Sequence, residues 1–224
     1  MKLLQNGFRA IVVILPWFLK RRLLEACYGY HLAKSARIGL AWIYPKHLEM
    51  AEGSRIGNLT VAIHLDRIRI DTFSTIGRGN WITGFPKNNR SHFAHIEDRN
   101  PELIIGKHSA ITKNHHLDCT ERIEIGSFTT IAGYHSQFLT HSINIEKGIQ
   151  DAHPISIGNR CFIGTNVVIL GGSQLPDCCV LGAKSMLSQK IEAPYSLVGG
   201  VPAKFVKALP ESSRYFTRTK GYVD

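Results

Sequence analysis

An aliphatic residue returns at every sixth position over one continuous stretch of the chain. The series is Ile157, Ile163, Ile169, Leu175, Leu181 and Leu187. An amphipathic helix repeats about every 3.6 residues and a half-buried strand about every 2, so neither gives this spacing. A small or compact residue precedes each later member by two positions: Cys161, Val167, Ser173, Cys179 and Ser185. We interpret the pattern as a pair of inward-facing positions that recurs every six residues.

The same spacing occurs earlier in the chain, with interruptions. It links Ile70, Ile76 and Ile82, then Ile105, Ile111, Leu117 and Ile123, and restarts after a two-residue slip at Ile125 and Ile131. Six-residue segments are too short to bury a core alone, so they must stack as a solenoid. Three segments make one triangular coil, with parallel strands stacked along each face. The alternative, an antiparallel sandwich, would show residue-by-residue alternation and irregular turn spacing.

The six-residue spacing places His115 and His135 at the small inward position, where we expect structural histidines. Two polar stretches break the spacing, and we expect inserted loops at about 84–102 and 134–154. Loops that leave a rigid scaffold are where functional residues concentrate. The repeat is expected over residues 36–192, followed over 193–224 by a tail with a short basic amphipathic helix.

Residues 1–35 are expected to form a separate helical segment. Its apolar run, Ala10–Leu19, is about half the length that crosses a bilayer, and its charge order differs from that of a signal peptide. One helical stripe holds Phe8, Ile11, Val12, Leu15, Leu19, Leu23 and Cys27, beside the basic run Lys20–Arg22. Two interpretations remain open. The helix either caps the repeat or packs on a sister subunit, or it lies on the anionic inner face of a membrane.

The net charge of +10 indicates an anionic partner. No nucleic-acid-binding module accompanies this charge, so we do not expect a nucleic-acid partner. The five cysteines are an odd number without a metal-type CxxC pair. They are typical of reduced thiols in a cytoplasmic protein, and no metal is expected.

Several motifs resemble those of the hexapeptide-repeat acyltransferases. They are the tandem [Ile/Leu]-Gly-x4 units, the turn Ile163-Gly164-Thr165-Asn166, the pair Gly182-Ala183 and the closing "GGVPAKFVK". The resemblance extends from about Ile56 to Leu209. It implies an all-β fold, a left-handed parallel β-helix, assembled as a homotrimer with active sites between subunits. It also implies an enzyme that transfers an acetyl group from acetyl-CoA.

The segment "NHHLDCTERIEIGSFTTIAGYHSQFLTHSI" is similar to one branch of this superfamily, the O-acetyltransferases of polysaccharide and lipopolysaccharide biosynthesis. The acceptor implied is the hydroxyl of a sugar or glycan, with lipid-linked glycans among the candidates. Direct transfer to a hydroxyl needs a general base, and neutral imidazole suits this role near pH 7.

The resemblance places the catalytic imidazole at His141 in "LTHSIN". His116, beside Asp118 in "HHLDC", is a second catalytic candidate. Relatives often have an acid where this chain has Asn144, so the carboxylate that orients His141 is expected from Asp118 or Glu146. Asn144 and His92 are the candidate acceptor contacts.

The resemblance also implies where the cofactor binds. Pantetheine is expected along the coils at Gly164, Thr165, Gly182 and Ala183, where missing or small side chains expose the backbone. Lys190, Lys204 and Lys207 are the candidate partners of the CoA phosphates.

Two other functions remain as alternatives. A gamma-class carbonic anhydrase uses the same solenoid but needs three histidines around zinc. The spacing of His115, His135 and His141 does not show that pattern. The second alternative is a non-catalytic scaffold.

Overall fold

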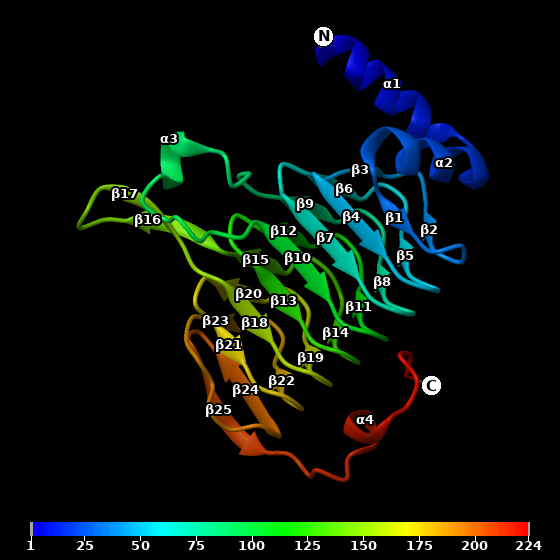
Figure 1. The fold of residues 1–224 in the computed structure, drawn as a ribbon. Helices are drawn as coiled ribbons and strands as arrows, with labels where there is room; N and C mark the ends of the chain where they lie inside the picture. The colour runs from blue at the N-terminus through cyan, green and yellow to red at the C-terminus, as the bar shows by residue number, and fades with distance from the viewer. Residues whose placement is uncertain (1, 224) are drawn as a thin grey trace.

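Three parallel β-sheets form the three faces of a prism (Figure 1). The structure is a computed structural model that describes residues 2–223, with side chains described for 4–89 and 91–223. Face 1 consists of β1 (His31–Leu32), β4 (His47–Met50), β7 (Arg67–Ile70), β10 (Glu102–Ile105), β13 (Ile123–Ile125), β18 (Ile155–Ile157) and β21 (Gln174–Leu175). Each coil runs through faces 1, 2 and 3 in turn.

Each of the first seven strands of face 2 follows a strand of face 1 along the chain, and these strands stack in the same order. It consists of β2 (Arg37–Ile38), β5 (Arg55–Ile56), β8 (Thr75–Ile76), β11 (Ala110–Ile111), β14 (Thr130–Ile131), β19 (Phe162–Ile163), β22 (Val180–Leu181), β24 (Ser196–Gly200) and the antiparallel β25 (Ala203–Ala208). Face 3 consists of β3 (Trp42–Tyr44), β6 (Val61–Ile63), β9 (Trp81–Thr83), β12 (His116–Asp118), β15 (Gln137–Leu139), β20 (Val168–Leu170) and β23 (Met186–Leu187).

The six-residue aliphatic series forms the core of this prism. Ile157 is in register with Leu175 on face 1, Ile163 with Leu181 on face 2, and Ile169 with Leu187 on face 3. All six side chains are buried. Burying each one contributes about 1.5–3 kcal/mol, so the period in the sequence fixes the stacking. The predicted triangular solenoid is confirmed.

The small inward positions carry hydroxyl groups for a structural reason. The Ser109 hydroxyl donates to the carbonyl of Gly126 at 2.6 Å and accepts from the backbone N–H of Thr129 at 3.0 Å. The Thr129 hydroxyl repeats this bridge, donating to Gly158 at 2.7 Å and accepting from Cys161 N–H at 3.0 Å. Corner backbone groups that the sheets leave unpaired are thereby satisfied inside the prism.

His115 forms an equivalent inward bridge to corner backbone groups, but His135 does not. His115 is 2% exposed, its backbone N–H donates to Asn80 Oδ1 at 2.9 Å, and its Nδ1 accepts from Ser136 N–H at 3.2 Å. The expectation of an inward His135 is wrong because the turn between Ile131 and Phe138 holds one extra residue. Ser136 takes the inward position, and His135 lies exposed in the turn at a φ of 60°.

The N-terminal segment forms two helices, α1 (Lys2–Ile14) and α2 (Trp17–Tyr28), which pack on the first coil (Figure 1). Pro16 ends the first helix because it lacks a backbone N–H. The expected continuous stripe is therefore wrong: Val12 and Leu24 are buried, whereas Ile11 is 58% exposed. Val12 and Leu24 join the core at the first coil, where the capping interpretation places the segment.

Lys20 is also not part of a surface basic cluster. Its ammonium group donates to the carbonyls of Val13 at 2.9 Å and Gly39 at 2.6 Å, and burial lowers its pKa to about 8. The lysine ties the break between the helices to the first coil. No helix among residues 2–223 is long and apolar enough to cross a membrane.

The predicted short C-terminal helix is present, and a strand precedes it. Residues Ala203–Ala208 form β25, which pairs with β24. Only α4 (Arg214–Thr217) is helical, and Tyr215 anchors it to face 2 by donating to the carbonyl of Cys161 at 2.9 Å. The parallel sheets begin at His31 and reach Gly200, so they extend beyond residues 36–192 at both ends.

Two insertions leave the prism where strands of face 3 end. The first follows β9 and contains α3 (Arg90–Phe93), and the second is the hairpin of β16 (His141–Asn144) and β17 (Ile149–Ala152). The second insertion begins later than residue 134 because β15 continues the coil to Leu139. In Figure 1 both insertions project from the same side of the prism.

His115→Ala is expected to destabilise the fold by about 2–4 kcal/mol, because it opens a cavity and leaves buried backbone groups unpaired. The melting temperature should fall by roughly 5–15 °C in thermal unfolding. His135→Ala serves as the matched control and should leave it nearly unchanged. Equal losses in the two variants would contradict this account of the core.

Candidate active site

The corner after face 3 brings together the ends of three adjacent strands. Thr83, Asp118 and Leu139 are the last residues of β9, β12 and β15, and they are in register. A hollow of about 730 Å³ opens there between the prism and the first insertion. Its lining consists of His64, Thr83, Gly84, Phe85, Pro86, Asn89, His116, Asp118, Leu139 and His141.

An imidazole–carboxylate pair lies in this hollow. Nδ1 of His141 is hydrogen-bonded to Oδ2 of Asp118, whose side chain is 6% exposed, against 33% for His141. The Thr120 hydroxyl donates to Oδ1 of Asp118 at 2.6 Å, and the Thr120 backbone N–H donates to the same oxygen at 3.2 Å. Of the two predicted orienting carboxylates, the structure brings Asp118 to the ring, whereas Glu146 lies exposed in the hairpin.

These contacts shift the pKa values of both Asp118 and His141. Burial would raise the pKa of Asp118, but hydrogen bonds from His141 and Thr120 outweigh it and lower the pKa. The hydrogen bond to Asp118 raises the pKa of His141, and partial burial opposes this effect. Each group therefore stabilises the charged form of the other.

The pair also selects one tautomer of His141. An ionised carboxylate only accepts hydrogen bonds, so we assign the ring proton to Nδ1. Nε2 then carries the free lone pair, and it has no hydrogen-bond partner among the described residues. A ring held in this way can accept a proton from a group bound in the hollow.

Two phenylalanines of the first insertion flank the histidine. The rings of Phe85 and Phe93 meet the His141 ring edge-on, with centroids 5.7 and 6.2 Å away. The buried Arg99 holds this wall, because its guanidinium donates to the carbonyls of Pro86 and Thr120 at 2.7 Å. It also lies over the Phe93 ring, 4.6 Å from the centroid. Sequence reasoning missed all three residues, since an insertion has no period that separates a buried arginine from an exposed one.

The other predicted site residues fall into two groups. His116 lines the hollow, two positions before Asp118 on the same outward face of β12. His92 and Asn144 do not line it. His92 Nδ1 lies 3.4 Å from the side-chain nitrogen of Gln150 and so joins the two insertions, while Asn144 Oδ1 accepts from Lys147 N–H at 3.1 Å within the hairpin turn.

The predicted cofactor residues lie apart from the hollow. They lie in the turns that lead from face 2 into face 3, at the N-terminal ends of the face 3 strands, whereas His141 lies beyond the C-terminal ends of these strands. These residues are Gly164, Thr165, Gly182 and Ala183. A Cβ on Gly164 would lie 2.6 Å from the backbone nitrogen of Ala183, so close coil stacking already requires this glycine. The predicted phosphate partners lie near the last coil: Lys204 and Lys207 are exposed on β25, and Lys190 is 3.4 Å from Glu192.

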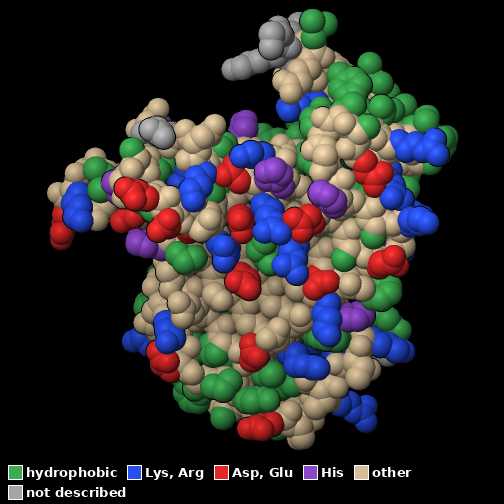
Figure 2. Space-filling view, in the orientation of Figure 1, with side chains coloured by type: hydrophobic (Ala, Val, Ile, Leu, Met, Phe, Trp, Pro, Cys, Tyr) green, Lys and Arg blue, Asp and Glu red, His purple; other side chains and the backbone are tan. Residues whose placement is uncertain are grey.

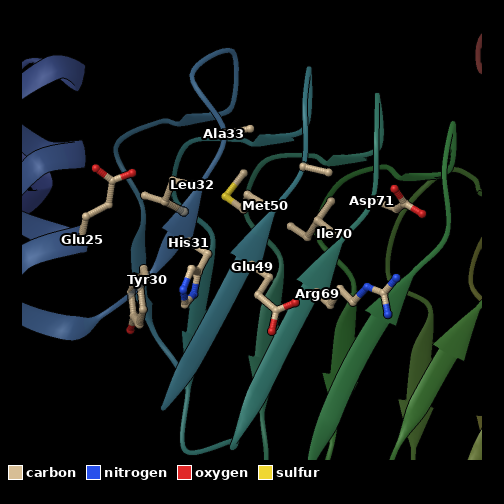
Figure 3. Close-up of a pocket in the computed structure, with 11 residues that line it drawn as sticks. Glu25, Tyr30, His31, Leu32, Ala33, Glu49, Met50, Arg69, Ile70 and Asp71 are labelled. Carbon is tan, nitrogen blue, oxygen red and sulfur yellow. The ribbon is translucent and has the colours of Figure 1, made fainter.

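A second hollow, of about 870 Å³, lies between α2 and the first strands of face 1 (Figure 3). It contains His31 and Glu49 on adjacent strands, but Glu49 pairs with Arg67 at 2.9 Å. The hollow thus lacks an oriented imidazole–carboxylate pair. Among residues 2–223, no group of three or more His, Cys, Asp or Glu side chains is arranged to hold a metal ion.

Comparisons with known proteins decide the family. A protein named probable macrolide acetyltransferase, from Lysinibacillus sphaericus, is 31% identical over 132 residues, which cover 55% of this chain and 67% of the relative. The galactoside O-acetyltransferase of Escherichia coli K12 is 26% identical over 150 residues, covering 65% and 69% of the two chains. The chain belongs to the hexapeptide-repeat acyltransferases. No family model matches it.

Solved structures agree on the fold. A variant of AntD, an N-acyltransferase from Bacillus cereus solved with dTDP-4-amino-4,6-dideoxyglucose and coenzyme A, superposes with a TM-score of 0.53 at 12% identity. The match covers 85% of this chain and 89% of that one. The predicted fold class, a left-handed parallel β-helix with an N-terminal helical segment, is confirmed, and so is the predicted enzyme class, an acyltransferase. Acetyl-CoA, the predicted acyl donor, agrees with the acetyltransferase names of both relatives.

Asp118→Asn tests the role of the pair in acyl transfer. Because Asp118 raises the pKa of His141 and only neutral imidazole accepts a proton, kcat/KM should rise with pH through an apparent pKa above about 6.5. Removing the charge should shift this rise to lower pH and reduce the plateau by roughly tenfold or more. The pH profiles of both proteins measure this. An unshifted profile would mean that Asp118 does not set the titration of the base.

Proposed function

We propose that the protein is an O-acetyltransferase that moves an acetyl group from acetyl-CoA to a hydroxyl of a sugar or glycan, with His141 as general base. The observation that carries the proposal is the His141–Asp118 pair in a hollow beside two insertions. The family supports acyl transfer, and the acceptor class is supported by the galactoside O-acetyltransferase among the relatives.

The chemistry follows from the tautomer of His141. Nε2 takes the hydroxyl proton as the acceptor oxygen attacks the thioester carbonyl, and Asp118 stabilises the imidazolium that forms. The tetrahedral intermediate then expels the CoA sulfur, and the proton passes from imidazolium to that leaving thiolate. The acetyl group ends on the acceptor oxygen without a covalent acyl-enzyme, and neutral His141 is restored.

The hollow has the composition of a site for a hydroxyl-rich acceptor. His116, Thr83 and Asn89 supply hydrogen-bonding groups, and Phe85 supplies an apolar wall. We assign His116 to acceptor binding or orientation. His92 and Asn144, predicted to contact the acceptor, stay candidates for its more distant parts.

The proposed path of acetyl-CoA begins in the turns at the N-terminal ends of the face 3 strands. Gly182 lies there, and a Cβ on it would be in van der Waals contact with Val198 and Ser185 at 3.5 and 3.6 Å, so we propose that pantetheine runs along the backbone of this turn. Thr165 and Ala183 belong to the same turns, and Lys190, Lys204 and Lys207 are the proposed phosphate partners. A flat face cannot enclose this path alone, so we propose a homotrimer in which a sister subunit completes the cleft.

We further propose a cytoplasmic protein that touches the inner face of the membrane through α1. Leu4 and Ile14 of this helix are 81% and 72% exposed, and Phe18 at the start of α2 is 63% exposed. Residues 2–28 contain a single acid, Glu25, which pairs with Arg21, and five basic residues, of which Lys20 is buried. Apolar side chains with basic neighbours suit an anionic lipid surface.

The double substitution Ile11→Asp and Ile14→Asp tests the membrane contact. It should abolish sedimentation with anionic vesicles, because two charges would enter the apolar face. Leu59→Asp, at a leucine that is 76% exposed outside these helices, is the matched control and should bind normally. If the double variant changes the oligomeric state instead of vesicle binding, α1 is a subunit contact.

His141→Ala should lower turnover by roughly 10² to 10⁴, the usual contribution of a positioned base. Affinity for CoA should stay nearly unchanged, because its proposed site lies at the N-terminal ends of the face 3 strands. Steady-state rates with labelled acetyl-CoA and a sugar panel, together with CoA binding, measure both quantities. His135→Ala, an exposed histidine outside the hollow, is the control. Full activity of the His141 variant would remove the proposed base.

A further inference from the structure

A polar groove continues the His141 hollow along the prism toward the N-terminal helices. It has a volume of about 1110 Å³ and shares His64, Pro86 and Asn89 with the rim of the hollow. Its walls come from α1 and α2 on one side and from the first insertion on the other. Figure 2 shows the recess between these two parts, at the upper edge of the molecule.

Arg9 is fixed in this groove by aromatic rings. Its guanidinium carbon lies 4.7 Å from the centroid of Tyr44 and 5.9 Å from that of Tyr28. The Tyr44 hydroxyl donates to the Arg9 carbonyl at 2.9 Å, which ties α1 to the coil at this point. Within residues 2–223 the guanidinium has no carboxylate partner. A planar cation held rigidly without a counter-ion is suited to bind an anion.

Other positive groups line the same groove. Lys46 lies two residues after β3, in the corner of its coil, and Lys87 lies opposite on the first insertion. The groove also holds two acids. One of them, Asp66, is engaged with the backbone N–H of Lys87 at 3.1 Å, and Glu97 is exposed. The cations therefore outnumber the acids, and Arg9 is the one held in place.

We propose that this groove binds a phosphate or diphosphate group carried by the acetyl acceptor. The proposal rests on the proposed function, since it takes the groove to continue the acceptor site. The strands β3, β6, β9 and β12 are adjacent and in register, so three strand spacings separate Tyr44, which lies under Arg9, from Asp118, which holds His141. This is about 14 Å. The phosphate thus lies farther from the reacting hydroxyl than one monosaccharide spans, which points to an oligosaccharide acceptor.

Two sources of such an acceptor share this chemistry, a glycan on a lipid diphosphate and one on a nucleoside diphosphate. Arg9 lies on α1, whose apolar side chains are exposed, so a lipid-linked phosphate would meet it at the membrane surface. The kinetic arms of the test separate the two sources.

Binding is measured first, by titrating inorganic pyrophosphate into protein saturated with CoA, which keeps the probe out of the cofactor site. Arg9→Ala should weaken binding roughly tenfold or more, the loss of a charge-assisted bond. Lys46→Ala should weaken it less, and because Lys46 is exposed this variant should fold normally. Lys107→Ala, an exposed lysine on another corner, should have no effect. Absence of binding to the wild type, or equal binding by the Arg9 variant, would overturn the proposal.

Kinetics then assign the ligand. Arg9→Ala should raise KM for a diphosphate-linked oligosaccharide and leave KM for the unphosphorylated oligosaccharide unchanged. A rise only for the lipid-linked form in vesicles assigns the lipid diphosphate, and a rise only for the soluble nucleotide conjugate assigns the nucleoside diphosphate. A rise in KM for acetyl-CoA instead would make the groove part of the cofactor site and overturn the proposal. If no sugar is acetylated, the proposed function fails while the pyrophosphate titration still reports on the groove.

Discussion

Close stacking of coils is the constraint on which the rest of the structure depends. Parallel strands on three faces leave an interior that admits one large and one small side chain per segment. Hydroxyl bridges such as that of Ser109 satisfy the corner backbone, and at Gly164 even a Cβ would collide with the next coil. Such a prism has flat faces and little freedom to form a concave site. A binding hollow must therefore come from segments that leave the repeat.

Both insertions leave after face 3, and this shared position creates the hollow. The strands β9, β12 and β15 are neighbours, so segments distant in the chain emerge side by side. Arg99 makes the arrangement rigid because it binds carbonyls of both the first insertion and the following corner at Thr120. Removing a cation from water is costly, and these carbonyl bonds together with the Phe93 ring offset that cost.

The sequence predicts those parts of the fold that repeat and fails where one residue breaks the count. The aliphatic period predicted the stacked coils, but the extra residue before Phe138 exchanged His135 for Ser136 in the core. Pro16 divided a stripe that looked continuous in the sequence. In the site, His141 followed from resemblance and Asp118 was one of two candidates. Phe85, Arg99 and Arg9 could not be predicted, because their positions depend on how aperiodic segments pack.

The electrostatics of this corner must satisfy two opposing demands. A base needs high proton affinity, yet it must be neutral before it acts, so the Asp118 charge that strengthens His141 also lowers the fraction of active enzyme at a given pH. Partial burial of the ring limits this loss by opposing the rise in its pKa. An acceptor phosphate beside His141 would add to the rise. A phosphate bound at Arg9 instead would lie over Tyr44, about 14 Å in strand spacings from Asp118, which exceeds the screening length of roughly 8 Å at physiological ionic strength. Separation along the prism would thus let the proposed anion-binding groove and a neutral His141 operate in one continuous site.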